Sequence, residues 1–231
     1  MTEISNKTVT PDVLSTIVSD WQEELSTLSI WQKDWLIRRV GPVVVGVCID
    51  VMQGKLDYRP TAFCDILTAP EDYLAFGLPS YWSPKVVALT IRPQFHDRHY
   101  KDAAAYLREH AYVPLDRSLS LDDIITGYKK YLRDHPNREF AEIPNHIRLL
   151  AVCREPRKAR KLLTWVKRKY KPGDFHYYGG RDALIETLER EIADPTILDR
   201  MVDEKVEALG FGDVPCFELD LSQTKSVWVN H

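Results

Sequence analysis

The sequence predicts an α+β fold in which a mostly antiparallel sheet of about five strands packs against several amphipathic helices. Two observations carry this prediction. The apolar segments 43–51 and 61–68 flank a short polar turn, which favours an antiparallel hairpin, and a third strand is expected at 86–92. Most of the helical periodicity lies before or after these strands, without the regular alternation of strand and helix that is typical of a doubly wound fold.

The N-terminal part of the chain is expected to begin with a loose arm at residues 1–9. Thr10 then suits a helix N-cap and Pro11 suits the first helical position, so a helix should begin here. Apolar residues recur at helical spacing as far as Leu28, which predicts an amphipathic helix of about five turns. The segment 43–51 is apolar on both faces, as expected of a central strand.

The rest of the chain is mainly helical in its periodicity. Ser120 and Asp123 have the spacing of a capping box, which predicts a helix start at Ser120. The apolar run 147–153 predicts a strand. Apolar and acidic residues alternate over 215–221, which predicts a closing strand with one buried and one solvated face. The expected helices cover residues 100–111, 120–132, 156–170, 181–192 and 194–210.

The length of 231 residues and the 44% share of apolar residues are enough for one sizeable core. No stretch rich in Gly, Ser or Pro divides the chain, so we expect a single integrated α+β domain over residues 1–231. A seam between two subdomains near residues 112–119 is the alternative.

The charge balance argues against a protein that coats nucleic acid. Lys and Arg number 31 and Asp and Glu 34, which gives a net charge of −3. No apolar run reaches the roughly 20 residues that cross a bilayer, and the N-terminus lacks the basic-then-apolar order of a secretion signal. We therefore expect a protein of the cytoplasm that makes no membrane contact.

The four cysteines are widely spaced and show neither a CxxC pair nor the Cys/His pattern of a zinc site. Three of them, Cys48, Cys64 and Cys153, lie in apolar runs, so we expect buried free thiols in a reducing compartment. The common hydrolase, kinase, dinucleotide and EF-hand motifs do not occur. We therefore expect no cofactor and assign no catalytic residue, although catalytic groups that converge from distant positions leave an enzyme open.

His96, His99 and His110 belong to the densest ionisable cluster of the sequence. Two histidines three residues apart can share one side of a turn, and His110 could supply a third nitrogen to a metal ion. Their spacing does not match a metallohydrolase signature such as H-E-x-x-H. A metal-dependent hydrolase that uses these three histidines is one hypothesis. The other interpretation is a solvated loop in which Asp97 or Asp102 caps the following helix.

The sharpest departure from average composition lies between Arg154 and Lys171, where nine basic residues accompany the single acidic residue Glu155. On a helix the apolar residues would keep one side, so the basic side could follow phosphates or meet an acidic protein surface. The other interpretation is a solvated helix that the acidic residues of 186–207 neutralise. The nucleic-acid hypothesis depends on Arg157, Arg160, Lys161, Lys167, Arg168 and Lys169.

The leading hypothesis is a non-enzymatic protein-interaction module of the bacterial cytoplasm, such as an immunity protein, an antitoxin or an accessory subunit of a conflict system. Its support is the missing catalytic set together with a mildly acidic and aromatic-rich composition, since exposed aromatic residues are enriched where proteins bind one another. We expect the partner to be another protein. The residues assigned to this contact are Trp31, Trp35, Trp82, Glu186 and Glu189.

Overall fold

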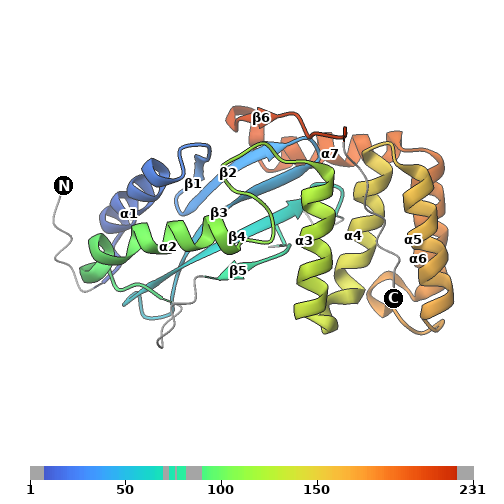
Figure 1. Ribbon diagram of the computed structural model, residues 1–231, viewed down its shortest axis with the longest axis horizontal. Coiled ribbons are helices and arrows are strands. Elements are labelled where there is room, and N and C mark those ends of the chain that lie inside the picture. The colour runs from blue at the N-terminus through green and yellow to red at the C-terminus, as the bar shows by residue number, and fades with distance from the viewer. Residues whose placement is uncertain (1–7, 70–72, 76, 82–89, 223–231) are drawn as a thin grey trace. The chain divides into compact units, whose positions relative to one another are not determined.

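The computed structural model describes residues 8–69, 73–75, 77–81 and 90–222, and it confirms the α+β class (Figure 1). The chain divides into two compact units that interleave along the sequence. Unit 1 comprises Met1–Asp65, Leu78–Leu119 and Asp213–Leu219, and unit 2 comprises Ile66–Gly77, Ser120–Gly212 and Asp220–His231. One boundary between the units lies after Leu119, at the end of the segment 112–119 where a seam was the alternative to a single domain. That the units form one integrated domain stays a prediction.

The described residues of unit 1 form a six-stranded sheet with the order β1-β2-β3-β4-β5, to which β6 adds beside β2. The pairs β1–β2, β2–β3 and β4–β5 are antiparallel, and β6 pairs with β2 in parallel. A tight turn joins β2 to β3, where Gly41 has φ +55°, a backbone conformation that favours glycine. The strands are β1 (Ser29–Gln32), β2 (Trp35–Val40), β3 (Val43–Val51), β4 (Tyr58–Ile66), β5 (Ser80–Tyr81) and β6 (Cys216–Phe217).

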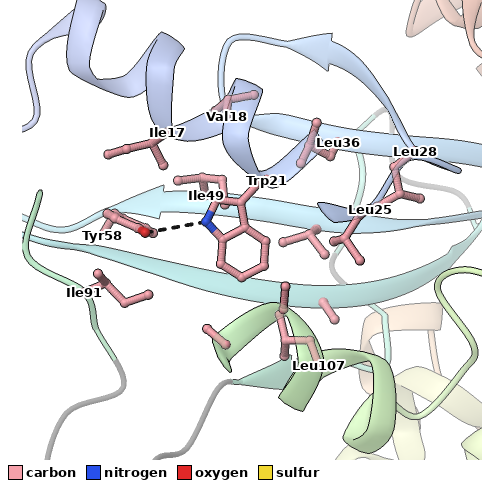
Figure 2. Packing of buried hydrophobic residues seen from close by; sticks show 14 of the residues in the cluster. Ile17, Val18, Trp21, Leu25, Leu28, Leu36, Ile49, Tyr58, Ile91 and Leu107 are labelled. Atoms are coloured by element: carbon pink, nitrogen blue, oxygen red, sulfur yellow. Dashed lines mark hydrogen bonds between the residues drawn. The ribbon is translucent and has the colours of Figure 1, made fainter. Parts of the chain in front are cut away.

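Helices α1 (Pro11–Glu24) and α2 (His96–His110) pack together on one face of this sheet (Figure 1). Thr10 caps α1 as predicted, because its hydroxyl accepts a hydrogen bond from the backbone N–H of Val13. The core between the helices and the sheet is centred on Trp21, which is fully buried (Figure 2). Val9 is buried in the same cluster, so the expected loose arm does not extend to this residue.

Unit 2 is a bundle of helices around α4 (Glu139–Val152), which contacts α3, α5, α6 and α7. The capping box at the start of α3 is confirmed, because Ser120 and Asp123 exchange hydrogen bonds between side chain and backbone. The other helices are α3 (Leu121–Asp134), α5 (Pro156–Lys169), α6 (Arg181–Ala193) and α7 (Thr196–Ala208). Short 3-10 turns lie at Pro93–Phe95, Pro136–Arg138, His176–Tyr178 and Phe211–Asp213.

The strand predicted at 147–153 is wrong, because Ile147 to Val152 form the C-terminal half of α4. Every residue of α4 from Ile147 to Ala151 is buried. A helix that is packed on all sides is apolar all round and loses the periodicity that separates it from a strand. A short apolar run alone therefore does not distinguish the two structures.

The closing strand is also shorter than predicted. Only Cys216 and Phe217 pair with β2, and both are exposed, so the expected buried face is wrong. The third strand predicted at 86–92 lies largely outside the described residues, although Ile91 bridges Tyr58 at the end of β4. Within the part of the chain that the structure describes, the helices are all too short or too polar to cross a membrane.

Candidate functional site

Helix α5 carries most of the basic segment, and its two sides differ sharply. Pro156 begins the helix at a position that suits proline, and four small or apolar side chains face the bundle. The opposite side is basic and open to solvent, which gives α5 a strongly amphipathic character. The buried residues are Ala159, Leu162, Leu163 and Val166.

The C-terminal end of α5 is held by a side chain from α6. The Arg181 guanidinium donates a hydrogen bond of 2.7 Å to the carbonyl oxygen of Tyr170 and one of 3.5 Å to that of Lys167. A cation at this end satisfies carbonyl groups that the helix leaves without a partner. The Tyr170 hydroxyl in turn donates to Glu139 of α4, and burial together with this carboxylate raises the pKa of Tyr170. These contacts fix α5 against α4 and α6.

Several basic side chains of the segment are neutralised by carboxylates of unit 2. Lys167 Nζ lies 2.5 Å from Oε1 of Glu189 on α6, and Lys169 Nζ lies 2.8 Å from Oε2 of Glu139 on α4. Lys158 pairs with the neighbouring Glu155. Arg154 pairs with Asp199 of α7, at 2.6 Å. The interpretation of a helix neutralised by 186–207 is therefore correct for part of the segment, through Glu189 and Asp199, whereas Glu139 and Glu155 lie outside that range.

Four other cations of α5 are exposed and have no carboxylate partner among the described residues. At 3.6 residues per turn they fall within a sector of about 100°, directly opposite the buried side of the helix. They span about 16 Å, or roughly three helical turns, at 1.5 Å per residue. We call this set the basic stripe, and its residues are Arg157, Arg160, Lys161 and Arg168.

The six residues predicted to bind nucleic acid are thus divided by the structure. The four of the basic stripe remain open, whereas Lys167 and Lys169 are engaged in ion pairs. The two acidic residues that we assigned to a protein contact, Glu186 and Glu189, are both exposed on α6. Glu189 forms an ion pair with Lys167, so Glu186 and Glu189 form an acidic edge beside the basic side of α5. The resulting surface carries both signs of charge.

The predicted aromatic contact residues lie in unit 1, where the structure describes them. Trp31 of β1 and Trp35 of β2 are half-buried and meet edge to face, with ring centroids 5.9 Å apart. Trp35 also packs edge to face on the buried ring of Phe63, at 5.2 Å. Trp35 therefore supports the sheet, while Trp31 lies on the outer strand. Trp82 is outside the described residues.

The three histidines of the metal hypothesis are not brought together. His96 begins α2 and His110 ends it, which separates them by about 21 Å along the helix axis. His110 stacks on Tyr106, at a ring distance of 4.0 Å, and the exposed end of α2 leaves it far from His96. His99 lies edge to face with Phe95, at 6.4 Å.

His96 instead belongs to a buried network that the sequence did not reveal. Its ring nitrogens lie 3.0 Å from Asp20 of α1 and 2.6 Å from the hydroxyl oxygen of Tyr58 on β4. Burial lowers the pKa of His96, against the opposing effect of the Asp20 carboxylate. Asp20 precedes His96 by 76 residues, so only the packing of α1 against α2 could show this contact.

A shallow cavity of about 340 Å³ in unit 1 is lined by Arg38, Arg117 and Phe217, among other residues. Arg38 is the buried cation of this cavity, but one of its terminal nitrogens already donates to the carbonyl oxygens of Pro114 and Arg117. Burial lowers the pKa of Arg38. These bonds tie the loop before Leu119 to β2, which indicates a structural role for this arginine.

Comparisons with protein-family models, curated proteins and solved structures found no match.

Proposed function

We propose that this chain is a non-enzymatic interaction module that uses the basic stripe of α5 to bind an acidic surface of a protein partner. An immunity protein, an antitoxin and the accessory subunit of a bacterial conflict system all act in this way, by holding another protein. The observation that carries the proposal is the stripe itself. Four exposed cations share one helix face, oppose the buried face, and have no carboxylate partner among the described residues.

The chemistry of the stripe suits carboxylates. Three of its four members are arginines, and a planar guanidinium binds a carboxylate through two parallel hydrogen bonds. Their spacing along one face matches acidic residues placed a turn apart on a partner helix. Electrostatic complementarity of this kind mainly accelerates association and selects the partner.

The acidic edge favours a protein over a nucleic acid as the partner. Glu186 and Glu189 are exposed on the neighbouring helix, and Glu189 reaches Lys167 on α5. A nucleic acid is negative along its whole length, so these carboxylates would repel it, and the net charge of −3 adds to that repulsion. A protein partner can present basic residues to the edge and acidic residues to the stripe.

The free cysteines support a reducing compartment, and we place the protein in the cytoplasm on this ground. Cys48, Cys64 and Cys153 are buried as free thiols, and Cys216 is free and exposed. Burial raises the pKa of the Cys153 thiol to about 12, which keeps it protonated and unreactive. An exposed free thiol such as Cys216 is most stable where disulfides do not persist.

The experiment is capture of partners from an extract of the protein's own cells, before and after nuclease treatment, with three forms of the tagged chain. The first is the wild type and the second is the stripe variant, which carries Arg157→Glu, Lys161→Glu and Arg168→Glu. The third carries the same charge change on exposed arginines outside α5. These are Arg138→Glu, Arg190→Glu and Arg200→Glu.

The proposal expects one nuclease-resistant protein, in stoichiometric amount, on the wild type and on the control variant but not on the stripe variant. Equal capture by the stripe variant contradicts it. Nucleic acid that the wild type retains, and that nuclease removes, would favour the second hypothesis. For that hypothesis the specific observation is Tyr177, 72% exposed in the turn between α5 and α6 and available for stacking on a base.

A further inference from the structure

Unit 1 brings three potential metal ligands together where α1 lies against α2. Asp20 comes from the last turns of α1, and His96 and Asp97 are the first two residues of α2. One ligand atom from each side chain lies within 4.8 Å of the other two. A single ion with bonds of about 2.0–2.2 Å would reach all three after these atoms draw slightly closer together.

We propose that Asp20, His96 and Asp97 form a binding site for a divalent first-row transition metal, with Zn²⁺ as its reference ion. One imidazole and two carboxylates are a donor set that Zn²⁺, Mn²⁺ and Fe²⁺ accept, whereas Mg²⁺ and Ca²⁺ prefer oxygen alone. The site lies in unit 1 and uses no residue of α5. It is therefore independent of the function proposed above.

Packing and hydrogen bonds fix the orientation of the His96 imidazole, as a metal-ligating histidine requires. Its side chain is fully buried, and the ring stacks on Tyr100 with a centroid distance of 4.5 Å. Nδ1 lies 2.6 Å from the Tyr58 hydroxyl oxygen, to which Trp21 Nε1 is also directed at 3.5 Å (Figure 2). A hydrogen bond at the nitrogen that faces away from the metal commonly fixes the tautomer and orientation of a ligating histidine.

The hydrogen bonds also define what metal binding must change. The Asp20 carboxylate only accepts, so His96 Nε2 carries the hydrogen in the present arrangement, and Nδ1 accepts from the Tyr58 hydroxyl. A metal at Nε2 displaces that proton to solvent, and Nδ1 takes up a proton from solvent and donates a hydrogen bond to the Tyr58 oxygen. The Tyr58 hydroxyl then turns its own hydrogen away from the ring. The imidazole stays neutral, and its tautomer is reversed.

The site is open on one side. The Asp20 side chain is 29% exposed and Asp97 is exposed, while His96 closes the inner side. An ion can therefore enter from solvent between the two carboxylates. Three protein ligands leave one position for water in a four-coordinate site. His99 and His110 take no part, which distinguishes this ligand set from the histidine cluster predicted from the sequence.

The test is calorimetric titration of the full chain with ZnCl₂. Asp97→Asn is the informative variant, because this exposed side chain can lose its charge without disturbing the core. Asp102→Asn is the matched control, an exposed carboxylate on the same helix that lies outside the cluster. We expect one equivalent of Zn²⁺ on the wild type and on Asp102→Asn, with affinity at least tenfold weaker for Asp97→Asn. Far-UV circular dichroism verifies that all three are folded.

Two further readouts separate this site from other histidines. The double variant His99→Gln/His110→Gln should keep the full affinity, and loss of binding would assign the ion to those residues instead. Nitrogen-detected NMR of the histidine rings should show His96 change from the Nε2–H to the Nδ1–H tautomer when Zn²⁺ is added. The proposal is overturned if no stoichiometric binding occurs, if Asp97→Asn binds as tightly as the wild type, or if the His96 tautomer does not change.

Discussion

Arg148 and Glu191 form an ion pair inside unit 2, with Nε 2.9 Å from Oε2 and side chains that are 3% and 5% exposed. The pair joins α4 to α6, the two helices against which α5 is held. The Arg148 guanidinium also lies over the ring of Tyr178, at 5.9 Å. Two buried charges that compensate each other therefore lie on the two helices that support α5, the helix with the basic stripe.

Removing one member of this pair should destabilise the protein strongly. Arg148→Met leaves Glu191 as a buried charge without its partner, for which we expect a loss of about 3–5 kcal/mol in the free energy of unfolding. Arg148→Met together with Glu191→Leu should cost less than Arg148→Met alone, because both charges are then gone. Urea denaturation measures the differences. A double variant less stable than the single variant would show that the pair itself contributes a large net stabilisation.

Stability should fall as the pH drops below neutrality, through His146 of α4. Burial, with a smaller effect from the charge of Lys129, lowers the pKa of His146 from 6.5 to about 3. The unfolded chain therefore binds one more proton than the folded chain between these values. The contribution of neutral His146 to the free energy of unfolding is fully present above pH 6.5. It declines by about 1.4 kcal/mol per pH unit below that value.

Denaturation by urea at pH 7, 6 and 5 checks this expectation against the variant His146→Phe. The phenyl ring can keep the stacked contact with Tyr128, whose ring lies 5.0 Å from that of His146, but it does not titrate. The variant should show a flatter dependence over this range. Identical slopes in the two proteins would mean that His146 is not the source of the effect.

Gly46 in β3 should not tolerate a side chain. A Cβ atom at this position would collide with the carbonyl oxygen of Leu36 and approach Cγ2 of Ile37 to 2.9 Å, both on the paired strand β2. We expect Gly46→Ala to lower the melting temperature clearly, with a loss of about 1–3 kcal/mol or more. Gly173→Ala is the control, since nothing lies within 4 Å of its Cβ position. Equal melting temperatures for the two variants would contradict the close approach of β2 and β3.

Trp31 and Trp35 should respond differently to truncation. Trp35→Ala removes a ring that packs on buried Phe63, so we expect a loss of about 3 kcal/mol in stability. Trp31→Ala removes a half-buried ring on the outer strand, and should cost less stability while reducing capture of the partner. Thermal unfolding and the capture assay separate the two effects. Full capture by a folded Trp31→Ala protein would remove this residue from the protein contact that the sequence predicts.

Local signals in the sequence were enough for much of the fold. Thr10 and Ser120 cap their helices through residues three positions away, so their roles can be read from the sequence itself. The apolar side of α5 follows from helical spacing in the same way. Helix α4 could not be recognised, because contact with four other helices removed the periodicity on which the prediction depends.

The candidate sites depend on contacts that no local pattern contains. The sequence placed nine cations near one another, but only the packing of α5 against α4 and α6 shows that Glu139 and Glu189 neutralise two of them. Likewise, the sequence grouped His96 with His99 and His110, whereas the structure places it against residues that are distant in the chain. Its close partners, Asp20 and Tyr58, lie 76 and 38 residues away in the chain.

The measurement that tests the central proposal most directly is the association rate of the purified chain with its captured partner, at about 50 and 150 mM salt. If the basic stripe steers this encounter, Arg157→Glu/Lys161→Glu/Arg168→Glu should associate at least tenfold more slowly than the wild type at the lower salt concentration. The control Arg138→Glu/Arg190→Glu/Arg200→Glu should remain within about twofold of the wild type. Association at the wild-type rate by a folded stripe variant would contradict the proposal that α5 forms the binding surface.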